Sequence, residues 1–404
     1  MTEENGTPSH THSETAAQLA ERAYEYIIQL SETIGPRPPG SNNEKAALAY
    51  IEEQLTSYGM DAELAGFLFP HHHFTPWITG AGVLFLVYAS AGRPPLLGLL
   101  LPISLLLAPD LGRWWNRRWN GSIPSSNVYT SLSSEDQPTL VLCAHVDTGK
   151  AAVLNRPFLL KLRGVTMDIA QRAALLLAAL GLAELAGFTI PHLISTTAAV
   201  IGAMTGFWLV FSETLEQLAR LDFYSPGAND NASGVGLALA LAEHYASNQP
   251  ESFNLAFLFT GAEEAGLHGA RAFARGLGSD SRTAVLSLDM VGAGNTLRYA
   301  SRDGVLFSRR ADARLNELIL QVNPQTRPLW YSLRSGDFAP FLENGIPATG
   351  LQVTGNARAD VHYHTAGDLA DRIELPALRL TAQTLLDLIN QLELQPDLLF
   401  SRSS

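Results

Sequence analysis

The stretch Leu255-Ala256-Phe257-Leu258-Phe259-Thr260-Gly261-Ala262-Glu263-Glu264 decides the fold, because it passes from an unbroken apolar run to two adjacent carboxylates. A run that is apolar at every position is typical of a strand covered by helices on both faces of its sheet. A second run, Ala284–Leu288, is apolar on both faces of the strand and is followed at once by Asp289. Ligands of open α/β sheets bind beyond the carboxyl ends of the strands, so both runs predict a site at that edge.

Strand and helix patterns alternate through most of the chain, which predicts an α/β fold. The expected strands and helices are Thr139–Ala144, Gly234–Ser247, Ser252–Thr260, Gly269–Gly276 and Thr283–Asp289.

A length of 404 residues suits one large α/β enzyme with insertions. The net charge of -12, from 27 basic against 39 acidic residues, argues against a nucleic-acid partner. Cys143 is the only cysteine, so no intrachain disulfide can form.

Charged residues make up only 16% of the chain, and two long apolar segments account for the deficit. These segments are Trp77–Ala108 and Ala173–Phe211, and prolines interrupt them at Arg93-Pro94-Pro95 and at Pro191. Proline breaks a helix, so each segment is predicted to form a helical hairpin, at residues 76–109 and 173–212. Ala173–Ile190 and Leu193–Phe211 approach the length of about 20 residues needed to cross a bilayer. The alternative interpretation is a buried helical subdomain.

The basic residues around the hairpins predict which side of a membrane the rest of the chain occupies. Both hairpins return the chain to the side that it left, and positive charge favours the cytoplasm. The returning ends carry Arg113, Arg117, Arg118, Lys161, Arg163 and Arg172, whereas the opposite tips carry only Arg93 and His192. We therefore expect a multi-pass integral membrane protein with its catalytic domain on the cytoplasmic side.

Five short motifs carry candidate metal ligands. In Ala144-His145-Val146-Asp147, alternation places His145 and Asp147 on one side of an extended backbone, so the imidazole could bind metal while the carboxylate supports it. In Pro226–Gly234, the carboxylate of Asp230 on a glycine-bracketed turn could bridge two cations. The alternatives are a solvated strand end in the first case and simple helix capping by Asn231 or Ser233 in the second.

The adjacent Glu263 and Glu264 repel each other unless a cation is near, and their side chains diverge. One could therefore bind metal while the other serves as a general base, although an exposed acidic loop is the alternative. Asp289 follows a strand, and His364 precedes the predicted helix Pro376–Leu392. Each residue alone could be an exposed side chain without a functional role. Together, these imidazoles and carboxylates form the nitrogen and oxygen ligand set suited to paired divalent metals.

The order and spelling of these motifs resemble those of the family-28 metallopeptidases, the co-catalytic zinc aminopeptidases. The resemblance covers Gly35–Ser41, the His-x-Asp, the Pro-Gly-Ala-x-Asp-x-Ala-Ser-Gly turn, the Glu-Glu pair, Leu288-Asp289-Met290 and the late His-Thr-x-x-Asp. It implies a central mixed sheet flanked by helices. It also implies two zinc ions, with His145 and Asp289 at one, Glu264 and His364 at the other, and Asp230 bridging both. Glu263 would then be the general base.

By this resemblance, residues 15–75, 110–172 and 213–404 form a zinc peptidase domain. Residues 1–14 are polar and are expected to form a disordered tail. The implied activity is that of an exopeptidase, an aminopeptidase before a carboxypeptidase, acting on peptides beside a lipid bilayer. The sequence leaves the oligomeric state unknown. Alternatives are a glutaminyl-peptide cyclotransferase-like relative, which would use one zinc and lack the first histidine, and a non-catalytic membrane binding subunit.

Two features depart from the family pattern. Phe338 follows Asp337 where the family often has histidine, so Asp337 is left out of the ligand set. The apolar insertions are the larger departure. If the strand Ser126–Ser131 pairs antiparallel with the strand that ends at Cys143, both hairpins leave from the catalytic edge, and the site faces the membrane.

Overall fold

A computed structural model of the protein describes residues 8–70, 121–133, 137–151, 157–219, 223–277, 282–304, 308–331, 335–355 and 362–400. The chain divides into two compact units. We call the first the sheet unit; it comprises Met1–Phe69, Pro124–Ala151 and Phe223–Ser404. The second, the hairpin unit, comprises Pro70–Ile123 and Ala152–Asp222.

The sheet unit is built on a mixed sheet with the strand order β1-β2-β4-β3-β5-β9-β6-β7, in which β8 pairs with β6. The four central strands β4, β3, β5 and β9 are parallel, and β2 and β6 flank them antiparallel. The bounds are β1 Ala62–Pro70, β2 Ser122–Ser131, β3 Thr139–His145, β4 Asn254–Thr260, β5 Thr283–Leu288, β6 Thr296–Asp303, β7 Arg309–Arg310, β8 Arg327–Tyr331 and β9 Ala348–Thr354. The predicted α/β fold with a central mixed sheet is confirmed.

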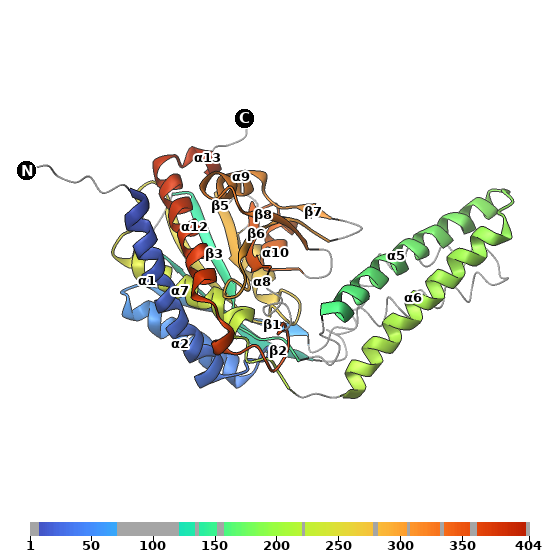
Figure 1. The fold of residues 1–404 in the computed structure, drawn as a ribbon, viewed down its shortest axis with the longest axis horizontal. Helices are drawn as coiled ribbons and strands as arrows, with labels where there is room; N and C mark the ends of the chain where they lie inside the picture. The colour runs from blue at the N-terminus through green and yellow to red at the C-terminus, as the bar shows by residue number, and fades with distance from the viewer. Residues whose placement is uncertain are drawn as a thin grey trace, which may run out of the picture. The chain divides into compact units, whose positions relative to one another are not determined.

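Helices cover both faces of this sheet (Figure 1). The side chains of β4 and β5 are buried throughout, as expected of strands that are apolar on both faces. One face packs on α1 Pro8–Ile28, α2 Asn42–Ser57, α7 Ser233–Ala246, α9 Ala313–Val322, α12 Leu375–Leu394 and α13 Asp397–Phe400. The other face packs on α8 His268–Leu277 and α10 Phe338–Glu343. Short turns of helix are η1 Gln29–Ile34, η2 Ala228–Ala232 and η3 Ala370–Arg372.

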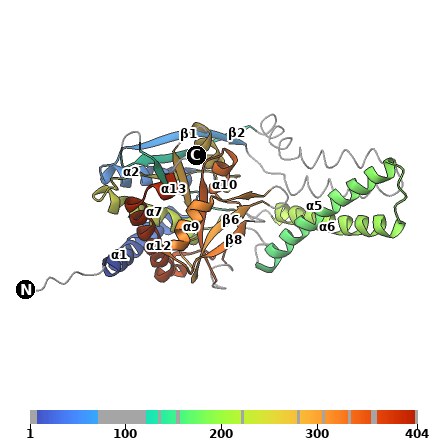
Figure 2. The ribbon, with the colours of Figure 1, turned by 90° about the horizontal axis from the view of Figure 1, so that it is seen from above.

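The parallel register brings the carboxyl ends of the central strands to one edge. His145 at the end of β3 lies opposite Thr260 at the end of β4, and Asp289 directly follows β5. Figure 2 shows β1 and β2 at the margin of the sheet. There β2 pairs with β4 instead of β3, with Val128 opposite Phe259, so the expected pairing with the strand that ends at Cys143 is wrong.

The N-terminal helix begins earlier than expected. Helix α1 starts at Pro8, so residues 8–14 are helical and only residues 1–7 of the expected disordered tail lie outside the described residues. Leu19, Ala23 and Ile27 recur at helical spacing and are buried in the core. This packing, against α7 and α12, extends over most of the helix and stabilises it.

The described part of the hairpin unit consists of α5 Pro157–Leu185 and α6 His192–Ala219, which pack against each other (Figure 1 and Figure 2). The predicted break at Pro191 lies between them. Within the described residues, one helical stretch, His192–Ser212, is long and apolar enough to cross a membrane. The predicted bounds of the helix Ala173–Ile190 are wrong. Helix α5 ends at Leu185, before Gly187, whose φ is +88°. The first predicted hairpin, residues 76–109, lies outside the described residues.

Candidate metal centre

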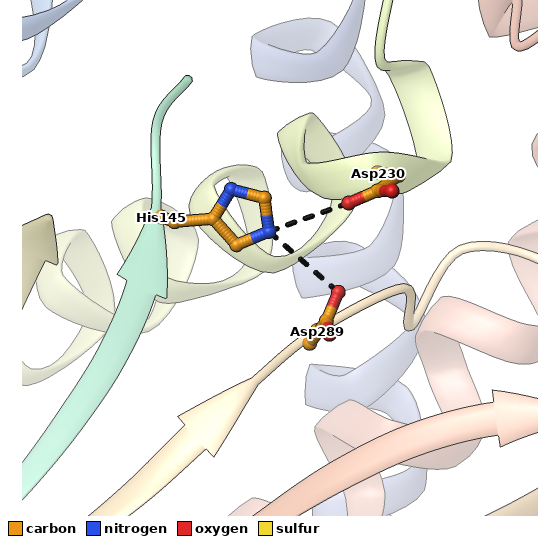
Figure 3. A group of neighbouring side chains, drawn as sticks. All are labelled: His145, Asp230 and Asp289. Carbon is orange, nitrogen blue, oxygen red and sulfur yellow. Dashed lines mark ion pairs between the residues drawn. The ribbon is translucent and has the colours of Figure 1, made fainter. Parts of the chain in front are cut away.

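The structure brings together the five side chains that the sequence singles out as metal ligands. His145 ends β3 and Asp289 directly follows β5, whereas Asp230 lies on the η2 turn. Glu264 lies in the loop after β4, and His364 lies in the segment before η3. Figure 3 shows His145, Asp230 and Asp289 converging from three separate elements. Their assignment as metal ligands stays a prediction.

These side chains form two groups that share Asp230. In the first group, the Nε2 atom of His145 lies 3.3 Å from Asp230 Oδ1 and 3.8 Å from Asp289 Oδ1 (Figure 3). In the second group, His364 Nε2 lies 3.2 Å from Asp230 Oδ2 and 2.7 Å from Glu264 Oε1. The two oxygens of Asp230 therefore face different imidazoles, which is the arrangement expected of a bridging carboxylate.

The donor set fits a pair of zinc ions. In each group the candidate ligand atoms lie within 4.8 Å of one another. Atoms bound about 2.0–2.2 Å from a tetrahedral zinc lie about 3.3–3.5 Å apart, close to the distances from Asp230 to both imidazoles. Asp230 Oδ2 and Asp289 Oδ1 are buried and accept no hydrogen bond from the described residues. Buried carboxylate oxygens without donors are costly unless a cation is present.

The local electrostatics match this interpretation. Burial alone would lower the pKa of His364, but the carboxylates of Glu264 and Asp230 outweigh burial and raise that pKa to about 10. Burial likewise acts against the charged form of His145, yet Glu263, Asp230 and Asp289 raise its pKa well above the ordinary value. For Asp230, burial raises the pKa, but His145 and His364 reverse this effect and lower it. The cluster thus attracts positive charge strongly.

The His145 imidazole is oriented differently from what the sequence suggests. Its Nδ1 atom lies 3.1 Å from the carbonyl oxygen of Asp147 and 3.8 Å from the Asp147 carboxylate. The carboxylate is fully buried and accepts hydrogen bonds from the backbone amides of Glu263 and Glu264, both at 2.9 Å. Asp147 therefore supports His145 through its backbone and supports the Glu-Glu loop through its side chain.

Glu263, the predicted general base, lies beside the two groups and is partly exposed to solvent. Burial raises the pKa of its carboxyl group, opposed by the charge of His145 and reinforced by that of Glu264. A raised carboxyl pKa suits a group that must both take and give a proton near neutral pH.

A buried carboxylate and a buried amide fix the turn that carries Asp230. Asp368 accepts hydrogen bonds from the amides of Asn229 and Asp230, at 2.8 and 3.0 Å. Burial raises the pKa of Asp368 to about 6, although these amides oppose the shift. Asn231 accepts from the amide of Met290 and donates to the carbonyl of Leu288, so it ties the turn to the end of β5.

Arg37 ties the same turn to the end of β3. Its guanidinium is buried and donates to the carbonyl oxygen of Val146 on one side and to those of Pro226 and Gly227 on the other. It also donates to the carbonyl oxygens of Leu30 and Gly35. Burial lowers its pKa to about 10, an effect opposed by Asp368, Asp147 and Asp230.

The backbone is unusual where it approaches the candidate ligands. Ala262, Met290 and His364 have φ values of 53°, 54° and 49°, a region that residues other than glycine rarely adopt. Such conformations persist where surrounding contacts enforce them and are common at functional sites. A Cβ atom at Gly149 would lie 2.4 Å from His364 Nε2, so a larger residue there would displace the imidazole.

The departure from the family pattern at Phe338 has a structural consequence. Phe338, the first residue of α10, is fully buried in the core and packs against Tyr331. Asp337 is also buried, and its carboxylate accepts hydrogen bonds from the Thr260 hydroxyl and the Cys143 thiol. Neither residue belongs to the two candidate ligand groups.

Sequence reasoning assigned no role to Arg37 or Asp368, although both lie inside motifs that it quoted. The signals were a charged residue between two prolines, in Pro36-Arg37-Pro38, and the aspartate that closes the late His-Thr-x-x-Asp. Their partners are mainly backbone atoms far away in the chain, which no residue pattern reveals.

Comparison with known proteins gives a family match and several sequence relatives, including the two described here. Residues 213–389 match the model of Peptidase family M28. A vacuolar membrane protease of Schizosaccharomyces japonicus is 48% identical over 68 residues, 17% of this chain and 8% of that protein. Aminopeptidase YwaD of Bacillus subtilis is 24% identical over 405 aligned positions, covering 89% of this chain and 82% of that protein. The chain thus matches a small part of the first relative and most of the second.

Solved structures share the fold at low sequence identity. An aminopeptidase from Aneurinibacillus sp. strain AM-1 superposes with a TM-score of 0.57 at 19% identity, covering 94% of this chain and 95% of the other. A Porphyromonas gingivalis glutaminyl cyclase gives a TM-score of 0.52 at 16% identity, covering 92% and 98%. Both kinds of enzyme share this architecture, so the fold alone does not choose between their reactions.

Proposed function

We propose that this chain, whose residues 213–389 match the model of Peptidase family M28, is a di-zinc exopeptidase of that family, of the aminopeptidase type and anchored in a membrane. The observation that carries the proposal is the pair of ligand groups that share Asp230. The similarity to Aminopeptidase YwaD over 89% of this chain supports the aminopeptidase assignment. A one-zinc cyclotransferase is disfavoured, because His145 and Asp289 would complete a second site beside Asp230.

His145 and Asp289 would hold one zinc ion, Glu264 and His364 the other, and Asp230 would bridge them. When bound, the two ions would supply Lewis acidity that polarises a peptide carbonyl and acidifies a water molecule. Glu263 would take a proton from the attacking water and return it to the nitrogen of the departing amine as the C–N bond breaks. Asp147 would hold Glu263 and Glu264 in place through their amides.

A substitution that removes only the proposed base tests this mechanism. In Glu263→Gln, we expect zinc content near that of the unchanged protein and turnover lower by about 10²–10⁴-fold, the usual contribution of a general base. Purified full-length protein would be analysed for zinc, then incubated with a peptide library that is read by mass. Loss of N-terminal residues supports an aminopeptidase, loss of C-terminal residues a carboxypeptidase, and loss of ammonia from N-terminal glutamine a cyclotransferase. Full activity in Glu263→Gln would refute the assignment.

The hairpin unit supports the membrane part of the proposal. Its outward side chains are large and apolar, and on α6 they include Val200, Met204, Phe207 and Phe211. The buried positions of the same helix are mostly small, namely Ala198, Gly202, Thr205, Gly206 and Ser212. Small residues inside and large apolar residues outside are typical of helices packed within lipid, not of helices in water.

We keep the cytoplasmic location of the sheet unit as a proposal that rests on the basic residues flanking the hairpins. Because Cys143 is fully buried, a cysteine introduced at exposed Asp371 can serve as the labelling site. In intact cells, a membrane-impermeant maleimide should not label Asp371→Cys, whereas the same reagent should label it after lysis. Labelling before lysis would place the sheet unit outside.

A further inference from the structure

The loop that carries Glu263 and Glu264 is held by a second buried carboxylate, that of Glu44 on α2. Glu44 has no solvent exposure. Its Oε1 atom accepts a hydrogen bond from the Ala262 amide at 2.9 Å. Its Oε2 atom accepts from the Gly40 amide at 2.7 Å and from the Ser125 hydroxyl at 3.0 Å. One side chain thus joins the start of α2, the strand β2 and the Glu-Glu loop.

Four consecutive amides of this loop are bound by side chains from elsewhere in the chain. The Gly261 amide donates to the side-chain oxygen of Asn127. The Ala262 amide donates to Glu44, and the amides of Glu263 and Glu264 donate to the two oxygens of Asp147. The loop therefore does not rely on its own sequence for its shape.

The loop needs such support because its conformation is unfavourable. Ala262 has a φ of 53°, which costs free energy for a residue with a Cβ atom. A Cβ atom at Gly261 would lie 2.3 Å from the Ser125 hydroxyl and 3.0 Å from Glu44 Oε1, so the backbone lies directly against this polar cluster.

We propose that Glu44 is a positioning residue, which fixes the backbone immediately before Glu263 and thereby aims that carboxylate at the reaction. This inference rests on the proposed function for the role of Glu263. The simpler interpretation is helix capping. Ser41 accepts from the Glu44 amide at the start of α2, and Glu44 accepts from the Gly40 amide just before the N-cap, an arrangement related to the capping box. Capping explains the contact with Gly40, but it does not explain a hydrogen bond to Ala262, 218 residues away.

Two substitutions separate positioning from capping. Glu44→Met keeps the approximate length of the side chain and removes both acceptor oxygens. Ser41→Ala removes the N-cap acceptor of the same helix and leaves the contact with Ala262 in place. In Glu44→Met, we expect kcat lower by about 10²-fold with KM and zinc content nearly unchanged, as for a small misplacement of a catalytic group. In Ser41→Ala, we expect kcat within about twofold of the unchanged protein and a lower melting temperature.

A readout independent of turnover is amide hydrogen exchange of the segment Thr260–Glu264 in the full-length protein. Glu44→Met should speed exchange in this segment, whereas Ser41→Ala should speed it only around the start of α2. If Glu44→Met does not fold, Glu44→Asp replaces it, because its shorter carboxylate can still cap α2 but cannot also reach Ala262. For this variant we expect faster exchange in the same segment and kcat lower by about tenfold.

The outcomes distinguish this inference from the proposed function. Unchanged exchange in Thr260–Glu264, or a kcat in the Glu44 variants equal to that of Ser41→Ala, would overturn the positioning role. If exchange changes as expected but the unchanged protein hydrolyses no peptide, the loop is positioned by Glu44 and the proposed peptidase activity is wrong.

Discussion

In the sheet unit, the carboxylate oxygens Asp230 Oδ2 and Asp289 Oδ1 are buried at the carboxyl edge of the strands and accept no hydrogen bond from the described residues. In the hairpin unit, large apolar side chains such as Met204 and Phe207 are exposed along a helix, with 68% and 62% of their surface accessible. Each pattern is costly in water by itself, because buried charge needs compensation and exposed apolar area is unfavourable.

Different partners would stabilise the two patterns, and this difference indicates function. Buried carboxylates without donors call for cations, and a helix with an apolar exterior calls for lipid. Under the proposed function, metal would complete the inside of one region and a membrane would cover the outside of the other. A substitution in one region is therefore expected to leave the property of the other unchanged.

The largest effect is expected in Asp230→Asn. A neutral amide cannot bridge two cations as a carboxylate does, so both metal groups lose affinity together. We expect zinc content to fall below one ion per chain and turnover to fall at least about 10³-fold, since several kcal/mol of transition-state charge stabilisation is lost. Zinc analysis of purified protein measures the first effect. Asp371→Asn, at an exposed position outside both groups, is the control and should change neither quantity.

Arg37→Met tests how far the ligand geometry depends on one buried cation. The change leaves carbonyl oxygens of Val146, Pro226 and Gly227 without their donor, so we expect a loss of about 3–5 kcal/mol in the free energy of unfolding. Association with membranes should not change, because the hairpin unit is not altered. Chemical unfolding measures the loss. The exposed Arg372→Met should stay within about 0.5 kcal/mol of the unchanged protein, and an equal loss there would contradict the assignment.

The candidate ligands could be predicted from the sequence because each one follows a recognisable element. His145 and Asp289 directly end apolar strands, and Asp230 lies in a turn bracketed by glycines. Parallel strands align their carboxyl ends, so local sequence patterns were enough to predict that these distant residues lie at one edge of the sheet.

The supporting residues could not be predicted in the same way. Arg37 and Glu44 act mostly on backbone atoms, and any residue type supplies a carbonyl or an amide. No complementary side chain in the sequence therefore marks their partners. The partner strand of β2 and the early end of α5 were missed for related reasons. Pairing partners depend on the whole sheet, and the apolar run continues past the turn at Gly187.

Phe207→Asp tests the membrane half of the comparison. A charged side chain costs about 2.5–3.5 kcal/mol at the middle of a membrane helix. Phe207 lies in the last third of the stretch His192–Ser212, so we expect a smaller cost and a partial loss of the protein from the membrane fraction after flotation with lipid vesicles. Turnover of a short soluble peptide in detergent should be unchanged. Trp330→Asp, at a position 44% exposed in the sheet unit, is the control and should float like the unchanged protein. Identical flotation of both variants would mean that α6 does not contact lipid.

The smallest effect is expected from a matched pair of leucines with almost equal exposure. Leu193 near the start of α6 is 78% exposed, and Leu394 at the end of α12 is 74% exposed. If both faced water, Leu→Ser at either position would have the same negligible effect. If Leu193 faces lipid, Leu193→Ser should weaken partitioning into vesicles by about 1–2 kcal/mol, whereas Leu394→Ser should leave it unchanged. Equal partitioning of the two variants would show that Leu193, like Leu394, faces water. The proposed difference between the surfaces of the two units would then be wrong.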